Sequence, residues 1–332
     1  MTPLTQTDSD IIPRLEAAAE KVQRAHRAAA TQIFGQDDVI ERTLITILSG
    51  GHALLIGVPG LAKTLLVDTL GKVLGLDAKR IQFTPDLMPS DIIGAEVLED
   101  QPGKARSFRF IKGPIFTQLL MADEINRASP KTQSALLQAM QEHHVTVAGQ
   151  RHDTPAPFHV LATQNPLEQE GTYPLPEAQL DRFLLQIDVT YPDLAAERRM
   201  LYSTTGTEER RVETVLNAAE LQSIQRLVRQ IPVPDKVVEA ILGLVRAARP
   251  GTGADAETDK YVAWGPGPRA SQALMLAVRA KALTDGRLAP SIDDVVALAE
   301  PVLKHRMALS FAARAEGQDV GGIIARLAGK LE

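Results

Sequence analysis

The feature that most constrains this 332-residue chain is a glycine-bearing turn between an apolar segment and a helical one. The turn and the start of the helix comprise Gly57, Val58, Pro59, Gly60, Leu61, Ala62, Lys63, Thr64 and Leu65. Apolar residues 52–56 precede the turn, and residues 65–70 have the apolar spacing of a helix. Strand, glycine turn and helix in this order are the context of a phosphate-binding loop. Glycines let backbone amides surround a phosphate, while the helix N-terminus directs N–H groups and its positive dipole end at the anion.

Two side chains of this segment have the chemistry of a nucleotide site. Lys63 is expected to reach the outer phosphates, and the Thr64 hydroxyl is expected to hold Mg²⁺. One position departs from the pattern G-x-x-x-x-G-K-[ST], because Ala62 replaces the second glycine. Alanine suits this position if its φ angle is negative and helical, and does not suit it if φ must be positive. The prediction of a nucleotide site therefore needs a second motif.

That second motif is an acidic pair, Asp123-Glu124, which follows the short apolar run Leu119–Ala122. A continuous apolar run of this length is typical of a strand buried on both faces of a sheet. Ligands bind at the carboxyl ends of strands in open α/β sheets. Asp123 is therefore expected to help hold Mg²⁺, and Glu124 to orient and polarise the attacking water. An isolated Asp-Glu pair is usually a solvated turn, but the strand and the upstream loop favour the catalytic interpretation.

Strand-like runs alternate with helical segments up to about residue 192, which predicts a doubly wound parallel sheet. A helix is expected from Asp8 to about Thr31. Two hairpins are expected, one from residues 94–98 and 107–111 around a polar turn, the other at residues 145–151. After Asp193 only helices are predicted. Residues 1–192 would thus form an α/β core, and residues 193–332 a smaller all-helical domain.

Several motifs together carry a resemblance to a known family: residues 57–64, 119–124, 123–128, 162–166 and 168–183. They resemble the MoxR family, in the helix-2-insert branch of the AAA+ ATPases, where Gly-Val-Pro-Gly-Leu-Ala-Lys-Thr is a common form of the loop. The resemblance covers about residues 30–310. It implies an AAA+ P-loop core with a helical lid, in which residues 57–64 are Walker A and residues 119–124 are Walker B. The hairpin within residues 84–114 would be the helix-2 insert.

The resemblance also implies roles for three residues outside the Walker motifs. Asn165 matches sensor 1, whose amide donates to the γ-phosphate or positions water, whereas alone it would be a turn residue before proline. Arg182 matches the arginine finger of the next subunit's site, whereas alone it would be a surface arginine. Arg269 matches sensor 2, and this branch leaves open whether it acts on its own site or its neighbour's. The residues implied to border adenine are Gly35, Gln36 and Val39.

The activity implied by the resemblance is hydrolysis of ATP to ADP and phosphate with Mg²⁺, in a hexameric ring. Hydrolysis would drive chaperone-like remodelling, maturation or activation of a client protein or metalloenzyme complex. The family commonly acts with a von Willebrand factor A domain partner, and this chain contains no such domain. Because a finger arginine acts across subunits, Arg182 itself favours a homo-oligomer joined by unlike faces.

Composition limits the other classes of function. The net charge of −5 and a pI of about 5.9 provide no global basic field for nucleic acid or anionic lipid. Aromatic residues make up 4% of the chain, so platforms for stacking bases are few. No apolar run approaches the ~20 residues that span a bilayer, and the first eight residues lack the layout of a signal peptide. The absence of cysteine fits a reducing compartment, so a cytoplasmic protein is expected.

Three alternatives remain at this point. The first is a nucleic-acid motor, because minichromosome-maintenance helicases share this branch; the charge and the tip Ala148-Gly149-Gln150 of the second hairpin argue against it. The second is a nucleotide-gated scaffold without significant turnover, in which Ala62 impairs catalysis. The third is the motor subunit of a chelatase, which is a nearer relative than either.

Overall fold

The computed structural model describes residues 11–99, 106–168, 170–205 and 212–331. Three parts of the sequence-based expectations lie outside the described residues. These are the N-terminal residues up to position 10, residues 100–105 of the polar turn in the first hairpin, and Gln169 within the motif 168–183.

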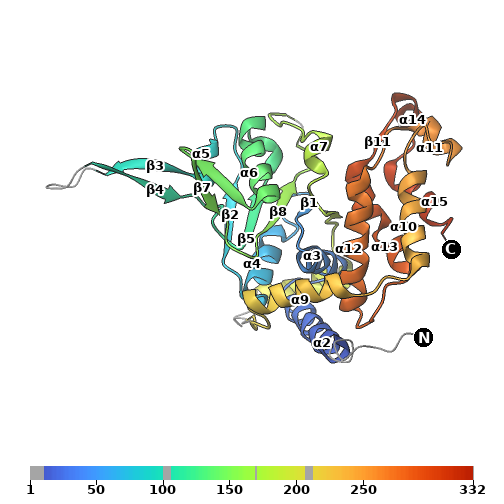
Figure 1. Ribbon diagram of the computed structural model, residues 1–332, viewed down its shortest axis with the longest axis horizontal. Helices are drawn as coiled ribbons and strands as arrows, with labels where there is room; N and C mark the ends of the chain where they lie inside the picture. Colours follow the sequence, from blue (N-terminus) through green and yellow to red (C-terminus); the bar gives the residue numbers. More distant parts are fainter. Residues whose placement is uncertain (1–10, 100–105, 169, 206–211, 332) are drawn as a thin grey trace.

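The centre of the molecule is a five-stranded parallel sheet in the order β2-β5-β8-β1-β9. Its strands are β1 (Ala53–Ile56), β2 (Ala78–Gln82), β5 (Leu119–Asp123), β8 (His159–Gln164) and β9 (Leu185–Asp188). Helices connect consecutive strands and lie on both sides of the sheet, as Figure 1 shows. This arrangement confirms the predicted doubly wound α/β core.

Alternation along the buried strands explains why helices cover both faces. Leu119 and Met121 pack into a cluster with α2 (Ile11–Ala30), α3 (Asp37–Leu48) and α4 (Lys63–Val73). Leu120 and Ala122 point to the other face and pack with α6 (Pro130–Glu142). All five residues of β5 are buried, as the continuous apolar run predicts. The strand ends where Asp123 and Glu124 interrupt that run.

Both predicted hairpins are present. The first pairs β3 (Gly94–Glu99) with β4 (Ser107–Lys112) after the short helix α5 (Pro89–Ile93), and it extends away from the body in Figure 1. The second pairs β6 (His144–Val147) with β7 (Gln150–Asp153). The two hairpins touch, because the His152 ring stacks on Phe110 with 3.9 Å between centroids.

The C-terminal part is helical, with one correction to the sequence-based expectation. Its helices are α8 (Leu194–Thr205), α9 (Ala218–Gln230), α10 (Asp235–Ala247), α11 (Ala256–Tyr261), α12 (Pro268–Thr284), α13 (Ile292–Leu303), η2 (Lys304–Arg306), α14 (Phe311–Ala315) and α15 (Val320–Ala328). The expectation of an all-helical domain is wrong, because β10 (Val262–Trp264) pairs antiparallel with β11 (Ala308–Leu309). Strands of three and two residues are too short to give a period-two pattern.

The C-terminal helices pack directly on the N-terminal ones. Helix α12 contacts α2, α3 and α9, and one hydrophobic cluster runs from the sheet through these helices to α13 and α15. In Figure 1 the orange and red helices stand beside the sheet, on the side away from the β3–β4 hairpin. Among the described helices none is both long and apolar enough to cross a bilayer.

Candidate nucleotide-binding site

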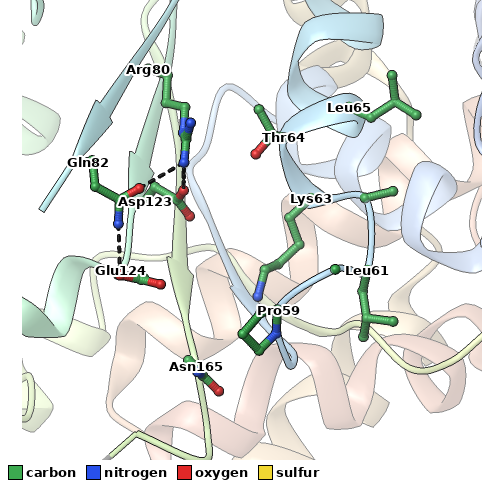
Figure 2. A pocket seen from close by; sticks show the side chains of 12 residues that line it. Pro59, Leu61, Lys63, Thr64, Leu65, Arg80, Gln82, Asp123, Glu124 and Asn165 are labelled. Atoms are coloured by element: carbon green, nitrogen blue, oxygen red, sulfur yellow. Dashed lines mark hydrogen bonds and ion pairs between the residues drawn. The ribbon is translucent and has the colours of Figure 1, made fainter.

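A cleft of about 520 Å³ opens at the carboxyl ends of β1, β5 and β8. We call it the nucleotide cleft and define it by its lining: Pro59, Gly60, Leu61, Ala62, Lys63, Thr64, Leu65, Arg80, Gln82, Asp123, Glu124 and Asn165. Figure 2 shows Lys63 entering from one side and the acids and Asn165 facing it from the other. The structure thus brings together the predicted loop, the acidic pair and the sensor asparagine, from three separate strand ends.

Backbone geometry explains the glycines of the loop. A Cβ at Gly57 would lie 2.7 Å from the carbonyl oxygen of Val189, so only glycine allows this approach to the end of β9. Gly60 has a φ angle of 86°, in the region that glycine adopts without strain. Helix α4 then starts at Lys63 with no side chain capping its N-terminus. Its first N–H groups are therefore donors suited to an anion in the cleft.

Ala62 does not have the negative, helical φ angle that would suit an alanine at this position. Its φ and ψ angles are 57° and 21°, so this alanine adopts the left-handed conformation that the usual glycine would take. For an L-residue this conformation costs about 1–2 kcal/mol. The loop therefore keeps its shape at the expense of local strain, and of the two cases that the sequence left open, the structure shows the one with positive φ.

Lys63 lies at the centre of the cleft. Its ammonium group donates hydrogen bonds to the carbonyl oxygens of Gly57 and Val58, the latter at 3.3 Å. Burial lowers the pKa of Lys63, and the negative charges of Asp123, Glu124 and Glu168 oppose that shift. These carboxylates keep a cation favourable at a position where it can reach the outer phosphates of a nucleotide.

Asp123 is held by two neighbours at the end of β5. Arg80 of β2 donates to its Oδ2 from Nε at 3.1 Å and from a terminal nitrogen at 2.6 Å. Thr163 of β8 donates to its Oδ1 at 2.6 Å. Carboxylate and hydroxyl oxygens are the hard ligands that Mg²⁺ prefers, and Asp123 and Thr64 line the same cleft. The donor set therefore fits Mg²⁺, provided that Arg80 gives up its contact or that a water lies between metal and carboxylate.

Glu124 follows directly and takes a left-handed backbone conformation, with φ of 55°. Its Oε2 accepts hydrogen bonds from Gln82 at 2.7 Å and from Arg127 at 3.1 Å. Its backbone N–H donates to the Thr163 hydroxyl at 2.9 Å. The carboxylate is thus restrained at the wall of the cleft, as the dashed contacts in Figure 2 show for Gln82.

Sequence reasoning missed Arg80, Gln82, Arg127 and Thr163. The first two are two residues apart at the carboxyl end of β2, which lies beside β5. Alternate residues of a strand share one face, so both side chains reach the two acids. Strand order, which brings β2 beside β5, is a property of the fold and not of the local sequence.

A smaller groove of about 200 Å³ shares residues 59–62 and Leu65 with the cleft. Gln36 lines this groove, and its side-chain amide donates to the carbonyl of Leu61 at 3.4 Å. Gly35 has a φ of 69°, and a Cβ there would lie 2.4 Å from Cβ of Ala196, which explains the glycine. Val39 is instead a core residue, 6% exposed. The groove has the position expected for the base of a nucleotide, and the roles of these three residues stay predictions.

Asn165 lies one residue beyond β8 and lines the nucleotide cleft. The residue is 6% exposed, and its Oδ1 accepts a hydrogen bond from the backbone N–H of Leu167 at 3.1 Å. That bond fixes the amide so that its NH₂ group is the end left to donate. Asn165 therefore lines the nucleotide cleft with an amide donor, and its role as sensor 1 stays a prediction.

The two predicted arginines lie elsewhere. Arg182 and Arg269 line a separate pocket of about 210 Å³, which we call the arginine pocket, together with Met140, Gln141 and Asp181. The Oδ2 atom of Asp181 is 3.7 Å from a guanidinium nitrogen of Arg269. A contiguous groove extends this pocket to Gly51 and His52, just before β1. The arginines are therefore at the amino ends of β1 and β9, opposite to the nucleotide cleft.

Comparisons with known proteins agree with this architecture. A family model described as ATPase family associated with various cellular activities (AAA) matches residues 52–185, and an AAA lid domain model matches residues 254–327. The chain is 42% identical over 303 residues to Chaperone MoxR1 of Mycobacterium tuberculosis, covering 91% of this chain and 79% of that protein. It is 30% identical over 328 residues to Protein MoxR of Methylorubrum extorquens, covering 93% and 92%.

A solved structure gives the same answer at the level of the fold. A crystal structure from Cytophaga hutchinsonii superposes with a TM-score of 0.87 at 37% identity, covering 97% of this chain and 96% of that one. The parallel sheet, the phosphate-binding loop followed by an acidic pair, and relatives that match nearly the whole chain lead to one assignment. The chain belongs to the MoxR family of AAA+ ATPases.

Proposed function

We propose that this protein hydrolyses ATP with Mg²⁺ at sites completed by a second copy of the chain. The observation that carries the proposal is the separation of two half-sites within one protomer. The nucleotide cleft contains the loop, the acids and Asn165, while Arg182 and Arg269 line a pocket that shares no residue with it. Each half contains chemistry that the other lacks.

The distance between the halves supports action across subunits. Val189, against which the loop packs, follows β9, whereas Arg182 precedes it. The four-residue strand alone is about 13 Å long at roughly 3.3 Å per residue. A neighbour that presents its arginine pocket to this cleft makes a contact between unlike faces, which closes into a ring. We therefore place both Arg182 and Arg269 on the neighbour's nucleotide, in a hexamer as the family implies.

Within the cleft each residue has a proposed task. Backbone amides of residues 59–65 and the Lys63 ammonium hold the phosphates, while Asn165 donates to the γ-phosphate or the attacking water. Thr64 and Asp123 would hold Mg²⁺, which neutralises charge on the phosphates when bound. Glu124 orients and polarises the water after leaving Gln82 and Arg127, and Arg182 stabilises charge in the transition state.

The process that ATP hydrolysis drives is proposed from the family. The relatives include a protein named as a chaperone, so we propose remodelling, maturation or activation of a client protein or metalloenzyme complex, with a von Willebrand factor A domain partner. The cysteine-free composition supports action in the reducing cytoplasm. The second hairpin gives no support to a nucleic-acid motor, because its Arg151 is paired with Asp153 at 2.8 Å.

Phosphate release by the purified protein tests the proposal. Wild type should release phosphate from Mg²⁺·ATP, and Glu124→Gln should lower the rate about 10²–10⁴-fold while ATP binding is retained. Glu239→Gln, on an exposed position of α10, is the matched control and should leave the rate unchanged. Wild type that binds ATP without releasing phosphate would support the scaffold alternative, and stimulation of the rate by DNA would support the nucleic-acid motor.

A further inference from the structure

Arg306 is a fully buried arginine to which no function has been given so far. It belongs to the short helix η2 in the lid region and is 2% exposed. Its guanidinium donates five hydrogen bonds, four of which go to residues 181–184. Nε contacts Oδ1 of Asp181 at 2.8 Å, and one terminal nitrogen contacts the carbonyl of Phe183 at 2.6 Å.

The other two residues of η2 bind the same stretch of chain. Nε2 of the buried His305 donates to the Phe183 carbonyl at 3.0 Å, and Lys304 pairs with Asp188 at the end of β9 at 2.5 Å. Burial lowers the pKa of His305 well below its usual range, so the ring is neutral at this contact. His305 and Arg306 are thus fastened to residues 181–184, which lead into β9, while Lys304 holds the last residue of that strand. We call these contacts the η2 clasp.

The clasped segment includes Arg182. Arg182 itself has few anchors: it donates to the carbonyl of Leu137, and its Nε has no partner among the described residues. Asp181 is shared, because one carboxylate oxygen binds Arg306 and the other faces Arg269 at 3.7 Å. Asp181 directly precedes Arg182 in the chain and faces Arg269, so the positions of both arginines depend on this aspartate, which Arg306 holds from the buried side.

We propose that Arg306 is a positioning residue, which fixes Arg182 and Arg269 relative to each other for the nucleotide of the neighbouring subunit. The inference rests on the proposed function, since it takes both arginines to act across the subunit boundary. Arg306 is buried and does not reach the nucleotide itself. Its effect is to prevent rotation of the lid away from residues 181–184, which would separate the two guanidinium groups.

A fixed geometry matters because a displacement of about 1 Å can cost 10²-fold in rate. Arg306→Gln removes the charge that faces Asp181 and most of the bonds to the carbonyls. We expect turnover to fall about a hundredfold, while the affinity for a fluorescent ATP analogue stays within twofold of wild type. Arg306→Lys keeps the charge and loses the forked hydrogen bonds, so its turnover should lie between that of wild type and that of Arg306→Gln.

Mixed oligomers distinguish an effect of Arg306 on the neighbouring subunit's site from damage to the variant's own cleft. Glu124→Gln subunits hydrolyse nothing themselves but offer an intact arginine pocket to an Arg306→Gln neighbour. A one-to-one mixture should recover about a quarter of the wild-type rate, since half of the cleft sites are intact and half of those face an intact neighbour. A mixture no more active than diluted Arg306→Gln alone would overturn the inference, as would wild-type turnover by Arg306→Gln.

Two references make this result specific. Arg287→Gln breaks another lid ion pair, with the buried Asp294 at 2.5 Å, and has no contact with residues 181–184, so its turnover should stay near wild type. A mixture of Arg182→Ala with Glu124→Gln tests the shared site itself. Rescue of Arg182→Ala without rescue of Arg306→Gln would reject only the role of Arg306. If Arg306→Gln does not fold, as a thermal melt would show, the same mixture with Arg306→Lys decides.

Discussion

The two ends of the parallel sheet differ in how their sites are built. At the carboxyl ends, the nucleotide cleft takes its main parts from residues 57–65 and 123–124, two short continuous segments. At the amino ends, the arginine pocket combines Met140 and Gln141 with Asp181, Arg182 and Arg269, so Arg269 is more than eighty residues away from the other four in the chain. The first end carries the chemistry that binds phosphate and activates water. The second presents two arginines, and among the described residues that line the pocket Asp181 is the one carboxylate beside them.

This difference supports the proposal that a complete site needs two protomers. A cleft rich in carboxylates needs an additional cation when charge develops on the transferred phosphate, and the same protomer keeps its cations at the far end of β9. Of the two cations that line the cleft, Lys63 is placed to bind the phosphates and Arg80 is already paired with Asp123 at 2.6 Å.

The largest effect is expected from the arginine pocket. Arg182→Ala should lower turnover about 10³-fold or more, because a finger arginine stabilises the transition state, while ATP affinity changes less than twofold. Steady-state phosphate release together with equilibrium binding of a fluorescent ATP analogue measures both. Arg314→Ala, an exposed position on α14, is the control. Equal loss of binding and turnover would mean that Arg182 acts in its own subunit's cleft.

The opposite pattern is expected in the cleft. Lys63→Met should weaken ATP binding about ten- to a hundredfold, because a charged hydrogen bond to the phosphates contributes about 1.5–3 kcal/mol. Lys72→Met lies on the exposed side of the same helix α4 and should bind ATP as wild type does. Unchanged affinity of Lys63→Met would show that the backbone amides alone hold the nucleotide.

The amino ends of the sheet should also make the fold sensitive to acid. His52 and His159 are buried there, and burial lowers their pKa values to about 3 and about 4. Both rings are neutral: Nδ1 of His52 accepts from the N–H of Val160 at 2.9 Å, and Nδ1 of His159 donates to the carbonyl of Gly51 at 2.8 Å.

Because both folded pKa values lie below 6.5, the unfolded chain binds more protons once the pH falls below 6.5. The free energy of unfolding should therefore decrease from about pH 6.5 toward pH 4, by up to about 1.4 kcal/mol per pH unit for each ring. Urea unfolding at pH 7, 6 and 5 measures this slope. His159→Asn should flatten it, while His26→Gln should not. A slope that His159→Asn leaves unchanged would mean that other groups cause the acid sensitivity.

The smallest effect concerns Ala62. Ala62→Gly removes about 1–2 kcal/mol of left-handed strain but adds roughly 0.5–1 kcal/mol of chain entropy to the unfolded state, so a gain of at most about 1.5 kcal/mol is expected. Ala148→Gly is the matched control, since Ala148 has a φ of 48° in the second hairpin. Thermal unfolding compares the two. A tenfold rise in turnover for Ala62→Gly alone would show that alanine restricts catalysis.

The same contrast explains what the sequence could predict. The cleft follows from local patterns, because a loop between strand and helix and an acid after a buried strand each lie within ten residues. The partners of the acids, Arg80 and Gln82, could not be found this way, since they depend on β2 lying beside β5. The role of Arg306 is still harder to predict, because it becomes visible only when the fold brings residues 304–306 against residues 181–184.

Two further features of the structure could not be predicted from the sequence. The sequence left the φ angle of Ala62 open, because an alanine at the position of the usual glycine is compatible with either sign of φ. Only the backbone shows that the loop imposes the left-handed conformation there. The pairing of β10 with β11 joins segments more than forty residues apart, each too short for a strand pattern.

The central claim is that the nucleotide held in one protomer's cleft is completed by the arginine pocket of the next. Phosphate release by a one-to-one mixture of Arg182→Ala and Glu124→Gln subunits tests it most directly, because neither variant alone has the parts of a working site. If the site is shared in this way, the mixture should recover about a quarter of the wild-type rate. A mixture as inactive as its two components would contradict it.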